Sequence, residues 1–131
     1  MQTIFQQDGI AGDFPAGYHV YALVICRSPG ITQDAIAKDI CVNKSTVTRR
    51  LDWLETEGYV VRCADECDKR RTLVYPTDKM IDVQKSVKKI AKEWKGILTE
   101  GISEEELAVF ESVITRMEEH GKAVVFKEVL Q

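Results

Sequence analysis

The stretch NKSTVTRRLDWLETEG, residues 43–58, has the apolar spacing of an amphipathic helix with a polar and cationic first half. If Val47 faces a core, a rotation of about 100° per residue returns Leu51 and Leu54 to that face. The opposite face then carries Ser45, Arg49, Asp52 and Thr56. Gly58 favours an end to the helix. The stretch therefore predicts a helix that presents hydroxyls and positive charge to solvent near its N-terminus.

A second, shorter helix is predicted directly upstream. Residues 32–40, TQDAIAKDI, begin at a threonine that can cap a helix and place their apolar side chains on one face. Only residues 41–43, CVN, separate the two predicted helices, and the apolar run 18–27 predicts a buried helix before them. Two helices joined by so short a turn, the second with a polar leading face, indicate a helix-turn-helix.

The segment that follows has the pattern of a β-hairpin. In YVVRCADECDKRRTLVY, residues 59–75, two β-branched and aromatic stretches flank a charged middle. Lys69, Arg70 and Arg71 fall near the predicted tip. A basic loop beside such a helix can reach the neighbouring groove of a duplex. The combination indicates a winged helix-turn-helix.

The last third of the chain carries two apolar stripes at helical spacing. The first repeats in steps of four and three, at residues 83, 87, 90, 94 and 97. A capping box then runs from Ser103 to Glu106. The second stripe consists of Leu107, Phe110, Ile114 and Met117. We expect a partner chain to bury both stripes, because one chain of 131 residues offers little surface against them.

The net charge of −3 conceals a basic middle: residues 38–95 hold 14 Lys and Arg against 10 acidic residues. Nucleic-acid binding depends on such a local patch more than on total charge. A helix N-terminus favours phosphate, and arginine can fork onto a guanine edge. We therefore predict contacts with double-stranded DNA from the following residues: Lys44, Ser45, Thr46, Thr48, Arg49, Lys69, Arg70 and Arg71.

Simpler interpretations stay open for single residues of the polar helix. Ser45 and Thr46 could only cap it, and Arg49 could belong to an ordinary solvated face. Arg50 lies near the core edge, so its stem is expected to pack while its head reaches water. Trp53 is expected to pack rather than to stack on bases. Two acidic residues of the helix face a DNA groove poorly and should either sit above it or pair with nearby Lys or Arg: Asp52 and Glu55.

The sequence offers little support for a catalytic, metal-binding or cofactor-binding function. It has no nucleophile elbow, phosphate loop or HExxH motif, so we predict no enzyme, metal or cofactor site. Without a signal peptide or a membrane-length apolar run, we expect a cytoplasmic protein with reduced thiols. Cys26 and Cys41 are expected to be small buried hydrophobes. Cys63 and Cys67 lie on the predicted hairpin, among charged residues.

Residues 30–62, GITQDAIAKDICVNKSTVTRRLDWLETEGYVVR, closely resemble the MarR family of bacterial transcription regulators. The pattern of Arg62, five residues, then Asp68, Lys69 and Arg70 is similar to that family's Asp-x-Arg wing. PTDK at 76–79, followed by two helical segments, looks like its closing dimerisation helices. The helix-turn-helix is the specific part of this resemblance.

The resemblance implies a mainly α fold with a small β-hairpin wing, an α+β class. A winged helix-turn-helix lobe at 18–77 would join dimerisation segments at 1–17 and 78–131 in one intertwined domain. The protein would act as a homodimer and repressor on a palindromic operator. Arg70 would enter the minor groove, while Asp68 and Arg62 would brace the wing.

Many relatives in this family bind a small aromatic or phenolic ligand, which implies release from DNA by such a ligand. The residues assigned to its cleft are Tyr18, His19, Tyr21 and Trp53. Two other functions stay open. One is a winged helix used as a protein–protein interaction module. The other is a thiol-based redox-sensing regulator, in which a disulfide between Cys63 and Cys67 would tighten the hairpin and move its basic tip.

Overall fold

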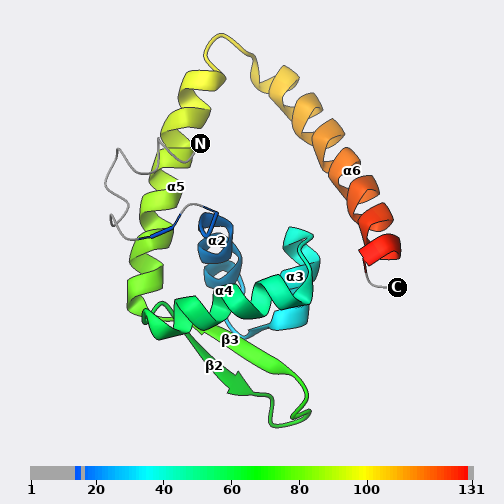
Figure 1. The fold of residues 1–131 in the computed structure, drawn as a ribbon. Coiled ribbons are helices and arrows are strands. Elements are labelled where there is room, and N and C mark those ends of the chain that lie inside the picture. The colour runs from blue at the N-terminus through cyan, green and yellow to red at the C-terminus, as the bar shows by residue number, and fades with distance from the viewer. Residues whose placement is uncertain (1–13, 16, 130–131) are drawn as a thin grey trace. The chain divides into compact units, whose positions relative to one another are not determined.

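The structure is a computed structural model that describes residues 14–15 and 17–129, with side chains up to residue 124. Most of the segment 1–17, assigned above to dimerisation, lies outside the described residues. The elements are α2 (His19–Arg27), β1 (Ile31–Thr32), α3 (Gln33–Ile40), α4 (Lys44–Thr56), β2 (Val60–Ala64), β3 (Thr72–Pro76), α5 (Asp78–Leu98) and α6 (Glu104–Val129) (Figure 1). The predicted class, mainly helical with a small antiparallel sheet, is confirmed.

The helix-turn-helix consists of α3 and α4, and each helix begins at a side-chain cap. Thr32 Oγ1 accepts a hydrogen bond from the N–H of Ala35 at 3.1 Å, as predicted. The cap of α4 is Asn43, whose Oδ1 accepts from the N–H of Thr46 at 2.8 Å. The Ser45 hydroxyl donates to the same Asn43 oxygen at 2.9 Å. The interpretation of Ser45 and Thr46 as caps is therefore wrong, because Asn43 already fills that position.

The turn between α3 and α4 passes through Cys41, which closes α3 in the left-handed region with φ 57°. The expectation that Cys41 is buried is wrong, because this C-cap position points its side chain to solvent. Cys26 in α2 is half-buried, and burial raises the pKa of its thiol. The two cysteines thus differ although both lie in the same lobe.

The backbone at Cys41 gives a stability prediction. A side chain with a Cβ costs about 1 kcal/mol or more in the left-handed region, and glycine avoids that cost. We expect Cys41→Gly to raise the free energy of unfolding by up to about 1 kcal/mol, and Cys41→Ala to give no gain. Urea denaturation of both variants checks this. Equal midpoints for the two would contradict it.

The sheet has the strand order β1-β3-β2, with both pairings antiparallel. The predicted hairpin is confirmed as β2 and β3, in which Arg62 lies opposite Val74 and Val60 opposite Pro76. It extends away from the helices of the lobe (Figure 1). The third strand, β1, is too short for its sequence pattern to predict. It pairs Ile31 with Val74 and Thr32 with Leu73, and so joins the start of α3 to the wing.

The hydrophobic core of the first compact unit, residues 1–90, includes buried side chains from α2, α3, α4, the sheet and α5. Val47, Leu51 and Leu54 of α4 are fully buried, as the helical projection predicts. The contribution of α5 consists of Met80, Val83, Val87 and Ile90. The expectation that a partner chain buries the whole first stripe is therefore wrong. Its part up to Ile90 packs within this unit, whereas Trp94 and Ile97 are exposed.

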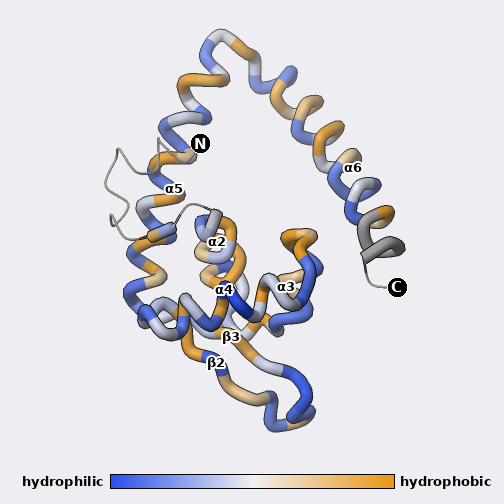
Figure 2. The backbone as a smooth tube through the Cα atoms, viewed as in Figure 1, coloured by the Kyte–Doolittle hydropathy of each residue, from blue (hydrophilic) through white to orange (hydrophobic). Residues whose placement is uncertain are grey.

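The second compact unit, residues 91–131, holds the end of α5 and all of α6. The capping box is confirmed, because Ser103 Oγ accepts from the N–H of Glu106 and a Glu106 carboxylate oxygen accepts from the N–H of Ser103. Figure 2 shows hydrophobic and hydrophilic residues alternating along both helices. The unit exposes many large apolar side chains: Trp94, Ile97, Leu98, Ile102, Val109, Phe110, Val113, Ile114, Met117 and Val124. No helix among the described residues is long and apolar enough to cross a membrane.

Candidate nucleic-acid interface

The polar face of α4 lies in solvent, as the sequence predicts. Lys44, Ser45, Thr48 and Arg49 are exposed, and Thr46 is half-buried. The α4 N-terminus therefore combines hydroxyls, two cations and the positive end of the helix dipole on one accessible surface. Such a surface suits a phosphate backbone and the acceptor groups of base edges. We refer to α4 as the recognition helix.

Arg50 differs from its neighbour Arg49 in position. It is half-buried, and its guanidinium carbon lies 5.5 Å from the ring centre of Tyr18 and 5.7 Å from that of Tyr21. The predicted position at the core edge is confirmed. Burial raises the pKa of Tyr21, and Arg50 opposes that shift. Arg50 therefore supports the aromatic interior of the lobe, while Arg49 lies in solvent.

The residues assigned to a ligand cleft belong to one packed aromatic cluster. The ring of Trp53 stacks on Tyr59 with centres 5.8 Å apart and lies 5.2 Å from Tyr18. Phe14 meets Tyr59 edge-on at 5.0 Å. His19 also contacts Phe14, and burial lowers the pKa of its imidazole. The predicted packing role of Trp53 is confirmed.

Arg62 on β2 ties the wing to the recognition helix. Its Nη2 donates to Asp52 Oδ1 at 2.6 Å and to Glu55 Oε1 at 3.3 Å, and its backbone N–H donates to Glu55 Oε2 at 3.0 Å. The expectation that Asp52 and Glu55 pair with a nearby cation is confirmed. The hydrogen bonds from Arg62 lower the pKa of Glu55, so this carboxylate is charged at neutral pH. The Arg62 side chain is only 18% exposed.

Gln33 is a further member of this network, and no pattern in the sequence identifies it. As the first residue of α3, it accepts a hydrogen bond from Arg62 Nη1 at 3.3 Å and donates one to Thr48 Oγ1 at 3.3 Å. Its amide thus links α3, the recognition helix α4 and the wing. The partners lie 29 and 15 residues away in the sequence, so no local pattern marks them.

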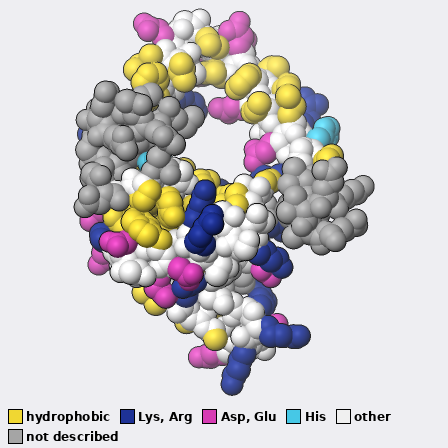
Figure 3. All heavy atoms as spheres, in the orientation of Figure 1, with side chains coloured by type: hydrophobic (Ala, Val, Ile, Leu, Met, Phe, Trp, Pro, Cys, Tyr) yellow, Lys and Arg dark blue, Asp and Glu magenta, His cyan; other side chains and the backbone are white. Residues whose placement is uncertain are grey.

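The tip of the wing is closed by local hydrogen bonds. Asp68 Oδ1 accepts from the backbone N–H of Arg70 at 3.1 Å, and the N–H of Arg71 donates to the carbonyl of Asp68 at 2.9 Å. Asp65 Oδ1 accepts from the N–H of Cys67 at 2.9 Å. The Arg70 side chain is 93% exposed. Figure 3 shows Lys and Arg side chains gathered at this free end, with acidic side chains beside them.

The two wing cysteines both carry free, exposed thiols. Cys63 lies on β2 opposite Leu73, and Cys67 lies in the turn region of the tip. Asp65 and Glu66 lie between them in the sequence. Their assignment as a redox pair stays a prediction.

A two-helix motif whose second helix exposes hydroxyls and cations, beside a hairpin with an exposed basic tip, defines a winged-helix DNA-binding protein. The MarR family model matches residues 23–72, which run from α2 to the start of β3. Over these residues, which include the helix-turn-helix, the chain is similar to the MarR family of transcription regulators.

Individual relatives and solved structures are similar over more of the chain. The chain is 26% identical over 105 residues to YybA of Bacillus subtilis (strain 168), an uncharacterized HTH-type transcriptional regulator. The matched region covers 80% of this chain and 70% of that protein. It is 25% identical to the solved MarR protein of Peptoclostridium difficile, with a TM-score of 0.85 over 96% of this chain and 82% of that one. The chain is also 25% identical to FabT of Streptococcus pneumoniae, which was solved in complex with DNA. That comparison has a TM-score of 0.77 and covers 94% of this chain and 88% of FabT.

Proposed function

We propose that this transcription regulator is a repressor, which binds a palindromic site on double-stranded DNA as a homodimer. The observation that carries the proposal is the joining of two exposed basic elements by Arg62. The N-terminal half of α4 would enter the major groove, and the wing tip with Arg70 would enter the adjacent minor groove. A repressor works where its operator lies, so the proposal places the protein in the cytoplasm.

The homodimer accounts for the exposed apolar side chains of the second unit. A monomer rarely leaves so many large apolar residues in solvent, and a contiguous patch of this kind usually marks an interface. Between the end of α5 and the start of α6 lies an open apolar pocket of about 630 Å³, lined by Trp94, Leu98, Ile102, Leu107 and Phe110 among others. A second copy of the chain would cover this surface.

Release by a small aromatic or phenolic ligand is the remaining part of the proposal. The cluster that holds Tyr18, Tyr21 and Trp53 offers ring faces, and Arg50 adds a cation that could pair with a phenolate or carboxylate. Because Arg50 belongs to the recognition helix, a ligand bound there would act directly on α4.

The DNA contacts are tested by two arginine variants. We expect Arg49→Ala to weaken operator binding by about 1–3 kcal/mol and to lower the preference for operator over random DNA. Arg70→Ala should weaken binding with a smaller loss of preference, because a minor-groove arginine reads groove width and potential more than base identity. Fluorescence anisotropy with operator and random duplexes at physiological salt measures both effects.

A matched control is Arg27→Ala, which removes an exposed arginine from the end of α2. It should leave both affinities unchanged. Operator binding like that of the wild type by both Arg49→Ala and Arg70→Ala would place the recognition surface elsewhere. A wild-type protein without salt-dependent affinity for duplex DNA would instead favour the protein–protein interaction module.

A further inference from the structure

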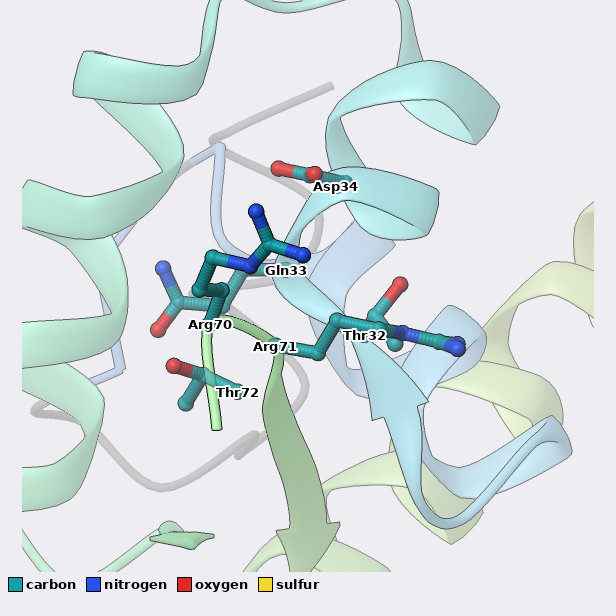
Figure 4. A pocket seen from close by; sticks show the side chains of 6 residues that line it. All are labelled: Thr32, Gln33, Asp34, Arg70, Arg71 and Thr72. Carbon is teal, nitrogen blue, oxygen red and sulfur yellow. The ribbon is translucent and has the colours of Figure 1, made fainter. Parts of the chain in front are cut away.

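A polar pocket of about 320 Å³ lies where the start of α3 meets the start of β3 (Figure 4). Its lining consists of Thr32, Gln33, Asp34, Arg70, Arg71 and Thr72. The pairing of Thr32 with Leu73 joins its two walls, so the start of α3 and the end of β3 nearest the wing tip are held together there. The pocket is therefore built from both halves of the DNA-binding lobe.

The pocket is rich in groups that donate hydrogen bonds. Figure 4 shows Arg70 extending toward Asp34, whereas Arg71 extends in another direction past Thr32. The ion pair of Arg71 with Asp65 is loose, with 3.9 Å between Nε and Oδ2, and its side chain is 56% exposed. Its guanidinium thus keeps donors for a further anion. The hydroxyls of Thr32 and Thr72 lie on the same lining.

One carboxylate opposes an anion in this pocket. Asp34 lies on its lining, but Lys44 Nζ of the recognition helix is 3.4 Å from Asp34 Oδ1. Both side chains are more than half exposed, so this ion pair is weak and readily rearranged. On the lining itself two arginines face one acid, while Asp65 and Asp68 contact those arginines from outside the lining.

The pocket is also connected to the recognition helix. Gln33, on its lining, donates to Thr48 Oγ1 of α4 and accepts from Arg62 Nη1 of the wing. The Thr48 hydroxyl in turn donates to the carbonyl of Lys44 at 3.0 Å. A group bound in the pocket would thus lie at a fixed position relative to the N-terminal end of α4.

We propose that this pocket holds one phosphate of the DNA backbone, bound by Arg71 with the hydroxyls of Thr32 and Thr72. Gln33 acts as a positioning residue, because its hydrogen bond to Thr48 fixes the position of the pocket relative to α4. Arg70 also lines the pocket, but its side chain is 93% exposed and is assigned to the minor groove. The proposal rests on the proposed function and adds a contact that is independent of base sequence.

The salt dependence of binding to random-sequence duplex DNA tests the pocket. Each phosphate contact contributes about 0.9 to the slope of log affinity against log salt, so Arg71→Gln should reduce the slope by about one for each bound subunit. Arg71→Lys should restore it, because lysine keeps the charge. Operator and random duplexes should lose affinity by the same factor. Titrations from about 50 to 200 mM KCl cover the useful range.

Lys85→Gln is the matched control, because it removes one exposed cation from α5 without touching the pocket. Its slope should equal that of the wild type. A wild-type slope for Arg71→Gln would overturn the pocket proposal, and so would a loss confined to the operator. Replacing chloride by inorganic phosphate at equal ionic strength should not displace the DNA. Displacement that Arg71→Gln abolishes would assign the pocket to free phosphate instead.

The failure of this proposal is distinguishable from that of the proposed function. If the wild type lacks salt-dependent affinity for any duplex, the proposed function itself fails. If the wild type binds with a steep slope that Arg71→Gln leaves unchanged, only the phosphate pocket fails.

Discussion

Arg62→Met is expected to lower the affinity for operator DNA by roughly 10- to 100-fold, or about 1.4–2.8 kcal/mol. The substitution keeps an unbranched side chain on β2 but removes the donors to Asp52, Glu55 and Gln33. Two carboxylates would then remain on the recognition helix without their cation, close to the DNA phosphates. The wing would also lose its tie to α4. Both effects act on binding more than on folding.

The expected loss of folding stability is smaller. Asp52 and Glu55 are 60% and 42% exposed, so solvent screens much of their attraction to Arg62. The pKa of Glu55 is lowered in the folded state, so its contribution is present above the unfolded pKa near 4.5 and is lost as pH falls through the folded value. At neutral pH the pair is fully formed. Assays at that pH therefore measure the whole effect on DNA binding.

Arg27→Met is the control, because Arg27 forms an ion pair of 2.8 Å with Asp39 elsewhere in the same lobe. It should leave DNA affinity unchanged. Adding Asp52→Asn and Glu55→Gln to Arg62→Met separates charge from geometry, since a recovery of affinity would assign the loss to the exposed carboxylates. Affinity of Arg62→Met within twofold of the wild type would show that the wing and α4 act independently.

Phe110→Glu is expected to convert a dimer into a monomer at micromolar concentration. The Phe110 side chain is 61% exposed in the single chain, so a charged replacement is tolerated there. In the proposed dimer it would bury a charge in an apolar interface, and a central aromatic residue of such an interface is worth about 2 kcal/mol or more. The dimer dissociation constant should therefore rise by at least roughly 30-fold. Light scattering over a dilution series measures the change against a chain mass of 14.8 kDa.

Ser112→Glu adds the same charge to α6 without replacing an apolar side chain. It should remain a dimer, and circular dichroism should show equal helix content in both variants. DNA affinity should fall in Phe110→Glu alone, because a monomer contacts only one half-site. A wild-type protein that gives a monomer mass at every concentration would contradict the homodimer.

Local patterns in the sequence predict the winged helix-turn-helix well. The spacing of Val47, Leu51 and Leu54 defines the buried face of α4, and the charged middle of residues 59–75 marks the hairpin. The same spacing separates Arg49 from Arg50 and assigns them different surroundings. These features depend on neighbours three or four residues apart, which is the range over which sequence periodicity carries information.

The features that the sequence does not predict depend on tertiary neighbours. Periodicity shows that α5 has an apolar stripe, but not that Val83, Val87 and Ile90 pack on their own chain while Trp94 remains exposed. Gln33 joins its network through contacts that only the folded chain creates. Cys41 is exposed because the backbone of the turn adopts a left-handed conformation there. A cysteine in the sequence does not predict that conformation.

The proposed regulator reads a specific DNA sequence. The most direct test is to incubate the purified wild type with fragments of its own genome at physiological salt and to sequence the retained DNA. The proposal predicts enrichment of a few sites with a shared inverted repeat, whose half-sites lie about one helical turn apart. Arg49→Ala should lose that enrichment. Retained DNA with the same composition as the input, at salt concentrations where the wild type still binds, would contradict sequence-specific regulation.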